Sequence, residues 1–165
     1  MTISRKKDEK INKLNEWREE KERLATTFFD NEHSIKEIKV SRGDIYNCYL
    51  GENIGHEQCK SRPVLIISSD FFNDRTSTVT VAPLSTTIVT KEIKKGGRPR
   101  RVLRFRTQYR LHQSKFNYLT EDSVVKLDQL KTVCKSRLLD KLGCLDERTQ
   151  SDINKKVIEY LDLKM

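Results

Sequence analysis

Short apolar runs separated by polar turns dominate the middle of the chain. Val64–Ile67 is a continuous β-branched and leucine run. It is too short for a helix and predicts a buried strand, with Pro63 at its first residue. Thr78–Leu84 alternates between hydroxyl and apolar side chains, which predicts a half-buried strand that ends at Leu84 or Ser85.

The polar segment between these two strands carries turn chemistry. Ser68–Asp74 contains serine, asparagine and aspartate, the residues that favour tight turns. If the two strands pair, Arg62 enters the first strand where Ser85 leaves the second. The pattern therefore places a guanidinium and a hydroxyl at adjoining strand ends.

Further strands and one long loop follow from the same kind of pattern. Gly43–Leu50 alternates enough to predict a strand, and Gly51–Ser61 predicts a long loop, the kind of segment on which a β scaffold carries binding residues. Ser123–Leu127 and Lys131–Val133 predict two further short strands.

Two helices are predicted towards the C-terminus. Lys135–Leu142 is predicted to be a short helix ended by Gly143, since glycine commonly follows the last residue of a helix. Asp146 is a suitable cap for the last helix. The apolar face of that helix consists of Ile153, Val157, Ile158 and Leu161.

The N-terminal residues form a charged extension. Lys6 to about Phe28 is predicted to be a helix with the incomplete apolar stripe Ile11, Leu14, Trp17, Ala25 and Phe28. A helix this polar needs something to lie against. Ser34–Val40 follows as a linker or a first short strand. We therefore divide the chain into residues 1–40, a helical extension and linker, and residues 41–165, the main domain.

The net charge points to a polyanionic partner. The 165 residues carry 33 Lys and Arg against 24 Asp and Glu, a formal charge of +9. Such a surplus favours nucleic acid, although it also occurs in basic proteins for solubility alone. Lys91–Arg110 is strongly basic, with Gly96 and Gly97 as a break and Arg101–Arg106 as a predicted strand.

This basic segment has two interpretations. Its charges could blunt the edge of a sheet. Alternatively it forms a groove that follows RNA phosphates beside Tyr109 and Phe116, because arginines and stackable rings suit single strands. We favour the groove, with Arg98, Arg100 and Arg101 as RNA-binding residues.

The four cysteines indicate a reduced, cytoplasmic setting. No Cys-x-x-Cys pair occurs and no apolar signal stretch precedes the cysteines. Cys48, His56 and Cys59 match no common zinc spacing, so we expect no metal. No apolar run approaches the roughly 20 residues of a membrane span, and no glycine-rich phosphate loop is present, so neither a membrane nor a cofactor is expected.

Four segments together resemble the MazF/PemK toxins of bacterial toxin–antitoxin pairs. They are Arg42–Tyr46, Gly55–Leu65, Val81–Ser85, and Asp128–Val133 continued by Lys135–Leu138. The resemblance runs from Arg42 to Leu161. It implies a mainly β fold with helices, namely an SH3-like barrel of the MazF/PemK/CcdB toxin type, with a C-terminal helix and an extra N-terminal helix.

The resemblance also implies a reaction and its site. Members of the family cut single-stranded RNA at specific sequences without a metal and leave 2′,3′-cyclic phosphate and 5′-OH ends. Arg62 and Ser85 match the arginine and the hydroxyl residue, often threonine, that the family uses. A guanidinium presents paired donors to phosphate oxygens but is too basic, with a pKa above about 12, to act as the base. The general base remains unassigned.

The long loop closes over the active site in the family. Here we predict that His56, Glu57, Gln58 and Lys60 bind RNA together with Thr86. His56 could also transfer a proton, although a solvated loop histidine is the commoner outcome. Cys59 and Lys60 stand where the family has small residues, which puts the flexibility of the loop in question.

The resemblance implies three kinds of partner: single-stranded RNA, a cognate antitoxin and a second copy of the chain in a homodimer. Trp17, Leu24 and Phe28 then pack on the barrel or on the dimer mate, or the N-terminal helix offers a surface to another partner or remains a mobile arm. Two other functions stay open: a gyrase-poison toxin that binds a protein and cleaves nothing, and a catalytically silent RNA- or DNA-binding module.

Overall fold

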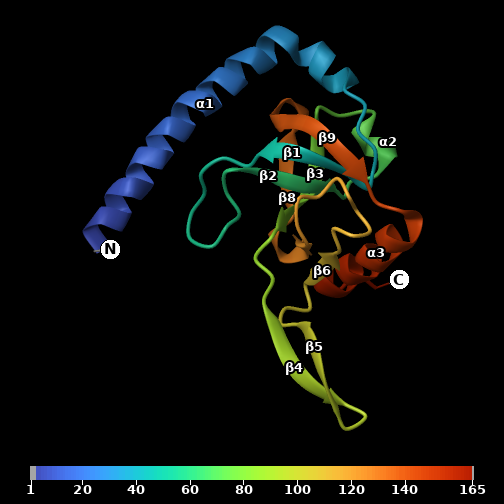
Figure 1. Cartoon of the computed structure of the whole chain (residues 1–165). Coiled ribbons are helices and arrows are strands. Elements are labelled where there is room, and N and C mark those ends of the chain that lie inside the picture. The colour runs from blue at the N-terminus through green and yellow to red at the C-terminus, as the bar shows by residue number, and fades with distance from the viewer. Residues whose placement is uncertain (1–2, 165) are drawn as a thin grey trace.

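A curved antiparallel sheet forms the body of the protein in the computed structural model, which describes residues 3–164 (Figure 1). Three α-helices accompany the strands: α1 (Ile3–Glu37), α2 (Asp70–Asn73) and α3 (Glu147–Leu161). The strands are β1 (Asp44–Tyr49), β2 (Ser61–Ile66), β3 (Thr78–Ser85), β4 (Thr90–Lys95), β5 (Arg98–Leu103), β6 (Gln108–Leu111), β7 (Ser123–Lys126), β8 (Lys131–Cys134) and β9 (Leu138–Cys144). The predicted β class with helices at both ends is confirmed.

Seven of these strands form one sheet in the order β6-β7-β3-β2-β1-β9, with β8 also paired to β3. Strand β3 therefore has β2 on one side and both β8 and β7, one after the other, on its other side. Strands β4 and β5 pair only with each other. Their hairpin projects from the body, away from the arch of α1 (Figure 1).

Both faces of the central sheet are covered, which explains the continuous apolar run in β2. Leu65 and Ile67 pack in a cluster with Ile153 of α3, whereas Val64 and Ile66 pack in a second cluster on the other face. Alternate residues of a strand point to opposite faces, so a strand with two covered faces must be apolar throughout. The buried strand predicted for this run is confirmed.

The strands predicted from residues 43–50, 78–84, 123–127 and 131–133 are present within one to two residues. Pro63 is the third residue of β2 and not its first, where it pairs with Asn47 of β1. The turn predicted for residues 68–74 contains the single helical turn α2. The basic strand lies at Arg98–Leu103 and not at Arg101–Arg106.

The helix predicted over Lys135–Leu142 is wrong. A single 3₁₀ turn, Lys135–Arg137, leads directly into strand β9, which pairs with β1 across two register shifts. Gly143 does not end a helix. It lies within β9, where the Tyr118 ring packs so closely on it that an added Cβ would sit 2.4 Å from Cδ1 of that ring.

The C-terminal helix forms as predicted and is capped by Asp146, whose side chain accepts a hydrogen bond from the Thr149 amide at 3.0 Å. Ile153 is buried and Val157 packs against the same cluster. Leu161, predicted to belong to this apolar face, is 46% exposed because it stands at the last turn.

The N-terminal helix is longer than predicted and is interrupted by a kink. It runs from Ile3 to Glu37, and Asn31 has non-helical angles of φ −131° and ψ 21°. Residues 34–37 are therefore helical, and no strand forms in the segment Ser34–Val40. Within the described residues, no helix is both long and apolar enough to cross a membrane.

Candidate active site

Strand register brings Arg62 and Ser85 to the same rim of the sheet. Strands β2 and β3 are antiparallel, with Leu65 opposite Ala82 and Val64 opposite Pro83. The same register carried two residues further places Arg62 opposite Ser85. The β2–β3 ladder itself stops at Val64; beyond it Arg62 pairs with Cys48 of β1 and Ser85 pairs with Val124 of β7. Both side chains are half-buried.

The guanidinium of Arg62 is held by the loop that precedes its strand. Its Nε donates to the Cys59 carbonyl at 2.7 Å, and Nη1 donates to Gln58 Oε1 at 2.5 Å. Nη2 makes no hydrogen bond to the described part of the chain. The side chain is thus fixed on one edge and retains free donors on the other, as an anion clamp requires.

Ser85 ends strand β3 beside a hollow. Its Oγ accepts a hydrogen bond from the Thr87 amide at 3.2 Å, and Val124 of β7 is its strand partner. The hollow has a volume of about 310 Å³ and is also lined by Pro63 and Tyr118. The hydroxyl remains partly accessible. Thr86, predicted to bind RNA, follows it and is exposed.

A second hollow, of about 390 Å³, opens on the loop side of the rim. Its lining includes Glu57, Gln58, Pro83, Gln129 and Lys131. Cavities of this size take ligands in other proteins. Gln58 lines this hollow and is also the partner of Arg62, so an occupant of the hollow would contact the residue that holds the guanidinium.

Gln129 and Lys131, which the sequence reasoning did not name as site residues, fix the loop from the barrel side. Gln129 Oε1 accepts from the Gln58 amide at 3.2 Å, and Lys131 Nζ donates to Asn53 Oδ1 at 3.0 Å. Burial is the main cause that lowers the pKa of Lys131, with Arg137 contributing. The signal that could have found both is their place in the segment Asp128–Val133.

The predicted loop residues are on the surface beside the rim. His56, Glu57 and Lys60 are exposed, and Gln58 is half-buried. The loop ends are joined, since the Lys60 amide donates to the Gly51 carbonyl at 2.6 Å. Lys60 adopts a left-handed φ of 69°, a conformation that favours glycine and is costly for a lysine.

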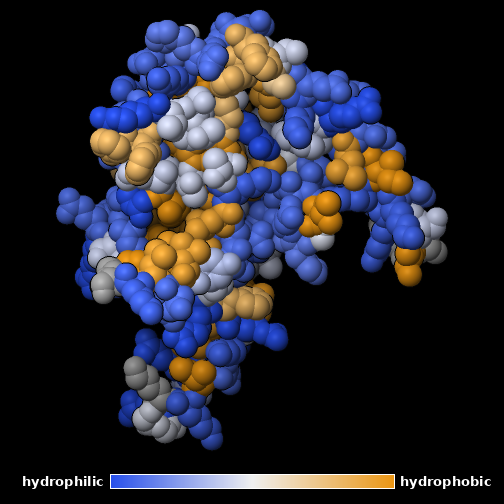
Figure 2. Space-filling view, turned by 180° about the vertical axis from the view of Figure 1, so that it is seen from behind, coloured by the Kyte–Doolittle hydropathy of each residue, from blue (hydrophilic) through white to orange (hydrophobic). Residues whose placement is uncertain are grey.

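Arg98, Arg100 and Arg101 are not part of this rim. All three are exposed on the hairpin, and within the described residues their only ion pair is the long 4.0 Å contact between Arg101 and Glu92. Figure 2 shows the projecting hairpin as a mostly hydrophilic surface. The arginines thus occupy a separate arm.

The groove predicted beside Tyr109 and Phe116 is wrong. Phe116 is buried in the cluster under α3, and the Tyr109 hydroxyl donates to Asp152 of that helix at 3.4 Å. Both rings follow the basic segment in sequence but turn inward, because the barrel needs them to fill its core. Neither ring is available to stack on a base.

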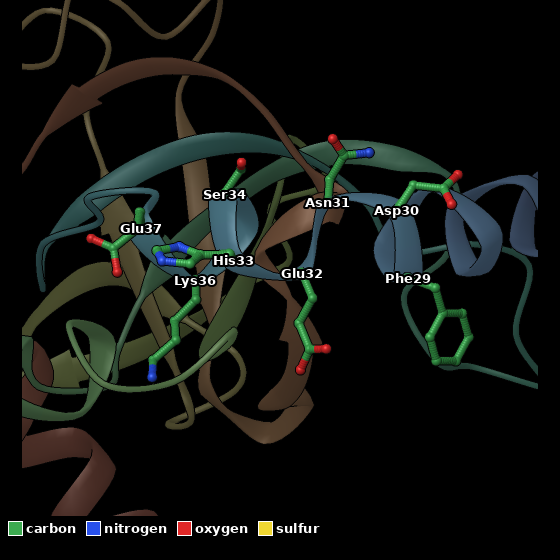
Figure 3. A pocket seen from close by; sticks show the side chains of 8 residues that line it. All are labelled: Phe29, Asp30, Asn31, Glu32, His33, Ser34, Lys36 and Glu37. Atoms are coloured by element: carbon green, nitrogen blue, oxygen red, sulfur yellow. The ribbon is translucent and has the colours of Figure 1, made fainter.

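The Cys48 thiol, metal binding and the hollow at the kink of α1 add no chemistry to the site within the described residues. Burial raises the pKa of the Cys48 thiol to about 11, and no group of three His, Cys, Asp or Glu side chains in residues 3–164 is placed to hold a metal. A hollow of about 540 Å³ lies at the kink of α1. Its lining is local to Phe29–Glu37, and the side chains radiate from the helix instead of converging (Figure 3).

Comparison with known proteins reveals related chains. A family model described as PemK-like, MazF-like toxin of type II toxin–antitoxin system matches residues 41–161. Endoribonuclease MazF of Staphylococcus saprophyticus is 34% identical over 118 residues, covering 72% of this chain and 88% of that protein. Endoribonuclease EndoA of Bacillus subtilis is 32% identical over 115 residues, covering 70% and 88%.

A solved structure has a similar fold. An endoribonuclease in complex with its cognate antitoxin, from a mycobacterial species, superimposes with a TM-score of 0.55 at 28% identity. The match covers 76% of this chain and 98% of that chain. Residues 1–40, which include all of α1, precede the segment that the family model matches.

Proposed function

The chain belongs to the PemK-like, MazF-like toxins of type II toxin–antitoxin systems, and on this premise we propose that Arg62 and Ser85 form the site where it cleaves RNA. Its activity is that of an endoribonuclease, the activity after which its relatives from Staphylococcus saprophyticus and Bacillus subtilis are named. The single observation that supports the site is the register of β2 and β3, whose last pair is Val64 and Pro83; the same register extended by two residues would set Arg62 opposite Ser85.

The residues at this rim suit phosphodiester cleavage without a metal. The reaction needs activation of the ribose 2′-OH, stabilisation of charge on the phosphate oxygens, and a proton for the leaving 5′-oxygen. Arg62 stabilises the phosphate through the N–H groups that Gln58 and Cys59 leave free, and it is the candidate donor to the leaving oxygen. Ser85 holds the scissile phosphate or the 2′-OH. Attack of the deprotonated 2′-oxygen on phosphorus breaks the bond between phosphorus and the 5′-oxygen, which takes up a proton, so that the ends are a 2′,3′-cyclic phosphate and a 5′-OH.

Single-stranded RNA is the proposed substrate, and the loop and the arm bind it differently. His56, Glu57, Gln58, Lys60 and Thr86 border the rim and are placed to contact bases or sugars near the cut. Arg98, Arg100 and Arg101 stand on the hairpin that begins five residues after Ser85. They supply a sequence-independent attraction for phosphates further along the strand.

The other partners follow from the family. A cognate antitoxin would inhibit this chain, as the mycobacterial structure contains an endoribonuclease with its cognate antitoxin. We also propose a homodimer in the cytoplasm. Sedimentation equilibrium of the purified protein, alone and with the antitoxin, would measure both associations.

Cleavage of a defined single-stranded RNA in excess EDTA tests the proposal. We expect internal cuts with 2′,3′-cyclic phosphate and 5′-OH ends, and no cuts with Arg62→Ala. Cleavage that appears only with an added divalent ion would contradict the metal-independent mechanism. RNA binding without any cleavage would favour the silent module instead, and toxicity with neither would favour a protein-binding toxin.

A further inference from the structure

The N-terminal helix is attached to the loop that holds Arg62. Lys10 Nζ lies 2.5 Å from Glu52 Oε1 and also donates to the Asn53 carbonyl. Glu52 is nearly enclosed, with 10% of its side chain exposed, while Lys10 is 38% exposed. This pair joins positions 42 residues apart, and it links α1 to the beginning of the Gly51–Lys60 loop.

Asn53 connects the contact with α1 to the opposite side of the loop. Its Nδ2 donates to the Gln58 carbonyl at 2.6 Å, and the Gln58 side chain accepts from Arg62. The contacts therefore run without a gap from α1 through Asn53 and Gln58 to the guanidinium. Lys131, bonded to Asn53 Oδ1, and Gln129, bonded to the Gln58 amide, hold the same residues from the barrel side.

Trp17 provides a second attachment on the same helix face as Lys10, seven residues or about two turns away. Its indole lies so close to Gly51 that an added Cβ there would sit 2.3 Å from Cε2. The Arg137 guanidinium lies over the ring, with Cζ 5.2 Å from its centroid, and Arg137 Nε donates to the Tyr49 carbonyl at 2.7 Å. The tryptophan thus packs where β1 ends and the loop begins.

The far end of α1 is also fixed. Ile35 is buried, and Lys135 Nζ donates to the carbonyls of Lys36 and Ile38 at 2.8 and 2.9 Å. A helix held at Lys10, at Trp17 and at its C-terminal end is not a mobile arm. It lies against the barrel, one of the alternatives that the sequence left open.

We propose that α1 is a brace for the Gly51–Lys60 loop, and that Lys10 is a positioning residue for Arg62. The inference rests on the proposed function, because Arg62 is the group whose orientation the brace maintains. The loop has little apolar packing of its own, since its one large apolar side chain, Ile54, is 79% exposed. Its order must come from hydrogen bonds and from the elements that lie against it.

The brace predicts a particular kinetic change. Lys10→Met keeps a long side chain on the helix but removes the charge that holds Glu52 and the Asn53 carbonyl. Gln58 then holds the guanidinium less firmly, and small errors in the position of a reacting group reduce rates strongly. We expect kcat to fall about 10-fold with little change in KM, and Lys10→Arg to restore most of the loss.

Two measurements test this in the full-length chain, with Lys13→Met as the matched control, since Lys13 is exposed on the same helix. The first is kcat and KM for RNA cleavage. The second is hydrogen exchange of the loop amides, with quenching of Trp17, the one tryptophan in the sequence, as a local reporter of α1. Lys10→Met should speed exchange in residues 51–60 and leave β1, β2 and β3 unchanged.

The outcomes separate this inference from the proposed function. A loop that exchanges no faster in Lys10→Met than in Lys13→Met overturns the brace. A faster loop with unchanged cleavage overturns the positioning role of Lys10. A wild-type protein that never cleaves RNA overturns the proposed function, while the exchange experiment still tests the brace.

Discussion

Strands β2 and β3, which carry the rim, and the hairpin of β4 and β5 are both antiparallel strand pairs, but the first pair is buried and the second is exposed. Val64 and Val81 of the rim strands are fully buried, whereas the described side chains of the hairpin are exposed apart from Val102 and Leu103. Packing fixes the rim strands from both faces, but only a backbone ladder of six residue pairs fixes the hairpin.

This difference separates two kinds of interaction with RNA. Stabilising one developing charge requires donors fixed in place, which a packed rim provides. Attracting a polyanion requires only net charge, which an exposed arm provides equally well. The hairpin holds several cations and the single carboxylate Glu92. Substitutions on the two regions should therefore have different consequences.

The largest effect is expected at Arg62 of the rim. Removing a preorganised donor to a transition-state charge typically raises the barrier by about 3 to 4 kcal/mol, so Arg62→Ala should lower kcat about 100-fold or more. The stability should change little, since the side chain is half-exposed and leaves only a loop carbonyl and an amide oxygen without a partner. Single-turnover cleavage and thermal unfolding measure the two quantities.

Arg75→Ala is the matched control for Arg62. Arg75 follows α2, near the opposite end of β2, and stacks over the Phe71 ring at 3.8 Å. Its loss removes the same charge without touching the rim. If both variants lost cleavage equally, overall charge and not the rim would be responsible.

The rim could be predicted from sequence because its determinants are local. The apolar run at Val64–Ile67 and the alternation at Thr78–Leu84 predict two strands, and strands that follow each other in sequence usually lie side by side. The register that opposes Arg62 and Ser85 follows. The inward turn of Phe116 was missed because a basic neighbourhood says nothing about which rings the core requires.

Contacts between distant segments could not be predicted. Nothing near Lys10 indicates Glu52, and the helix predicted over Lys135–Leu142 rested on Gly143, a residue that commonly follows the end of a helix. In the fold Lys135 is completely buried, and strand pairing with β1 overrides the local preference of residues 138–144. Tertiary pairing decides β structure more than intrinsic propensity does.

The second largest effect is expected where α1 meets the barrel. Lys135→Met would leave the carbonyls of Lys36 and Ile38 without their donor, at a cost of about 2 kcal/mol of unfolding free energy. For a chain of this length that corresponds to a melting temperature lower by about 6 °C. Differential scanning calorimetry measures this change in melting temperature. The exposed Lys36 on the same helix end is the control, and equal losses in Lys36→Met would contradict the special role of the buried lysine.

A smaller effect is expected on the arm. Replacing Arg98, Arg100 and Arg101 with glutamine should weaken RNA binding about tenfold at low salt and reduce the slope of log affinity against log salt by about 2, because each phosphate contact on a single strand contributes about 0.7. The exposed positions should leave stability within about 0.5 kcal/mol. Fluorescence anisotropy over a salt series measures the slope.

The control for the arm removes the same charge from another region. Arg5, Arg18 and Arg23 are exposed on α1, where each pairs with a glutamate of its own helix. Their replacement with glutamine should leave the slope nearly unchanged. Equal slopes for the two triple variants would mean that net charge, and not the arm, attracts the RNA.

The smallest effect is expected at Asp146, the exposed N-terminal cap of α3. Hydrogen bonds, first from Lys115 and then from Thr149, lower the pKa of the Asp146 carboxyl from its ordinary value of 3.8. A carboxyl with a lowered pKa in the folded state stabilises the protein above its ordinary pKa, and this contribution is lost as the pH falls towards the folded-state pKa.

Asp146→Asn keeps a capping oxygen and should cost less than about 1 kcal/mol of unfolding free energy at pH 7. Its stability should also fall less steeply than that of the wild type below about pH 4, as urea unfolding at pH 7, 4 and 3 would show. Asp140→Asn, at an exposed position of β9, should keep the wild-type pH dependence, and a parallel change in both variants would assign the effect to overall charge instead of the cap.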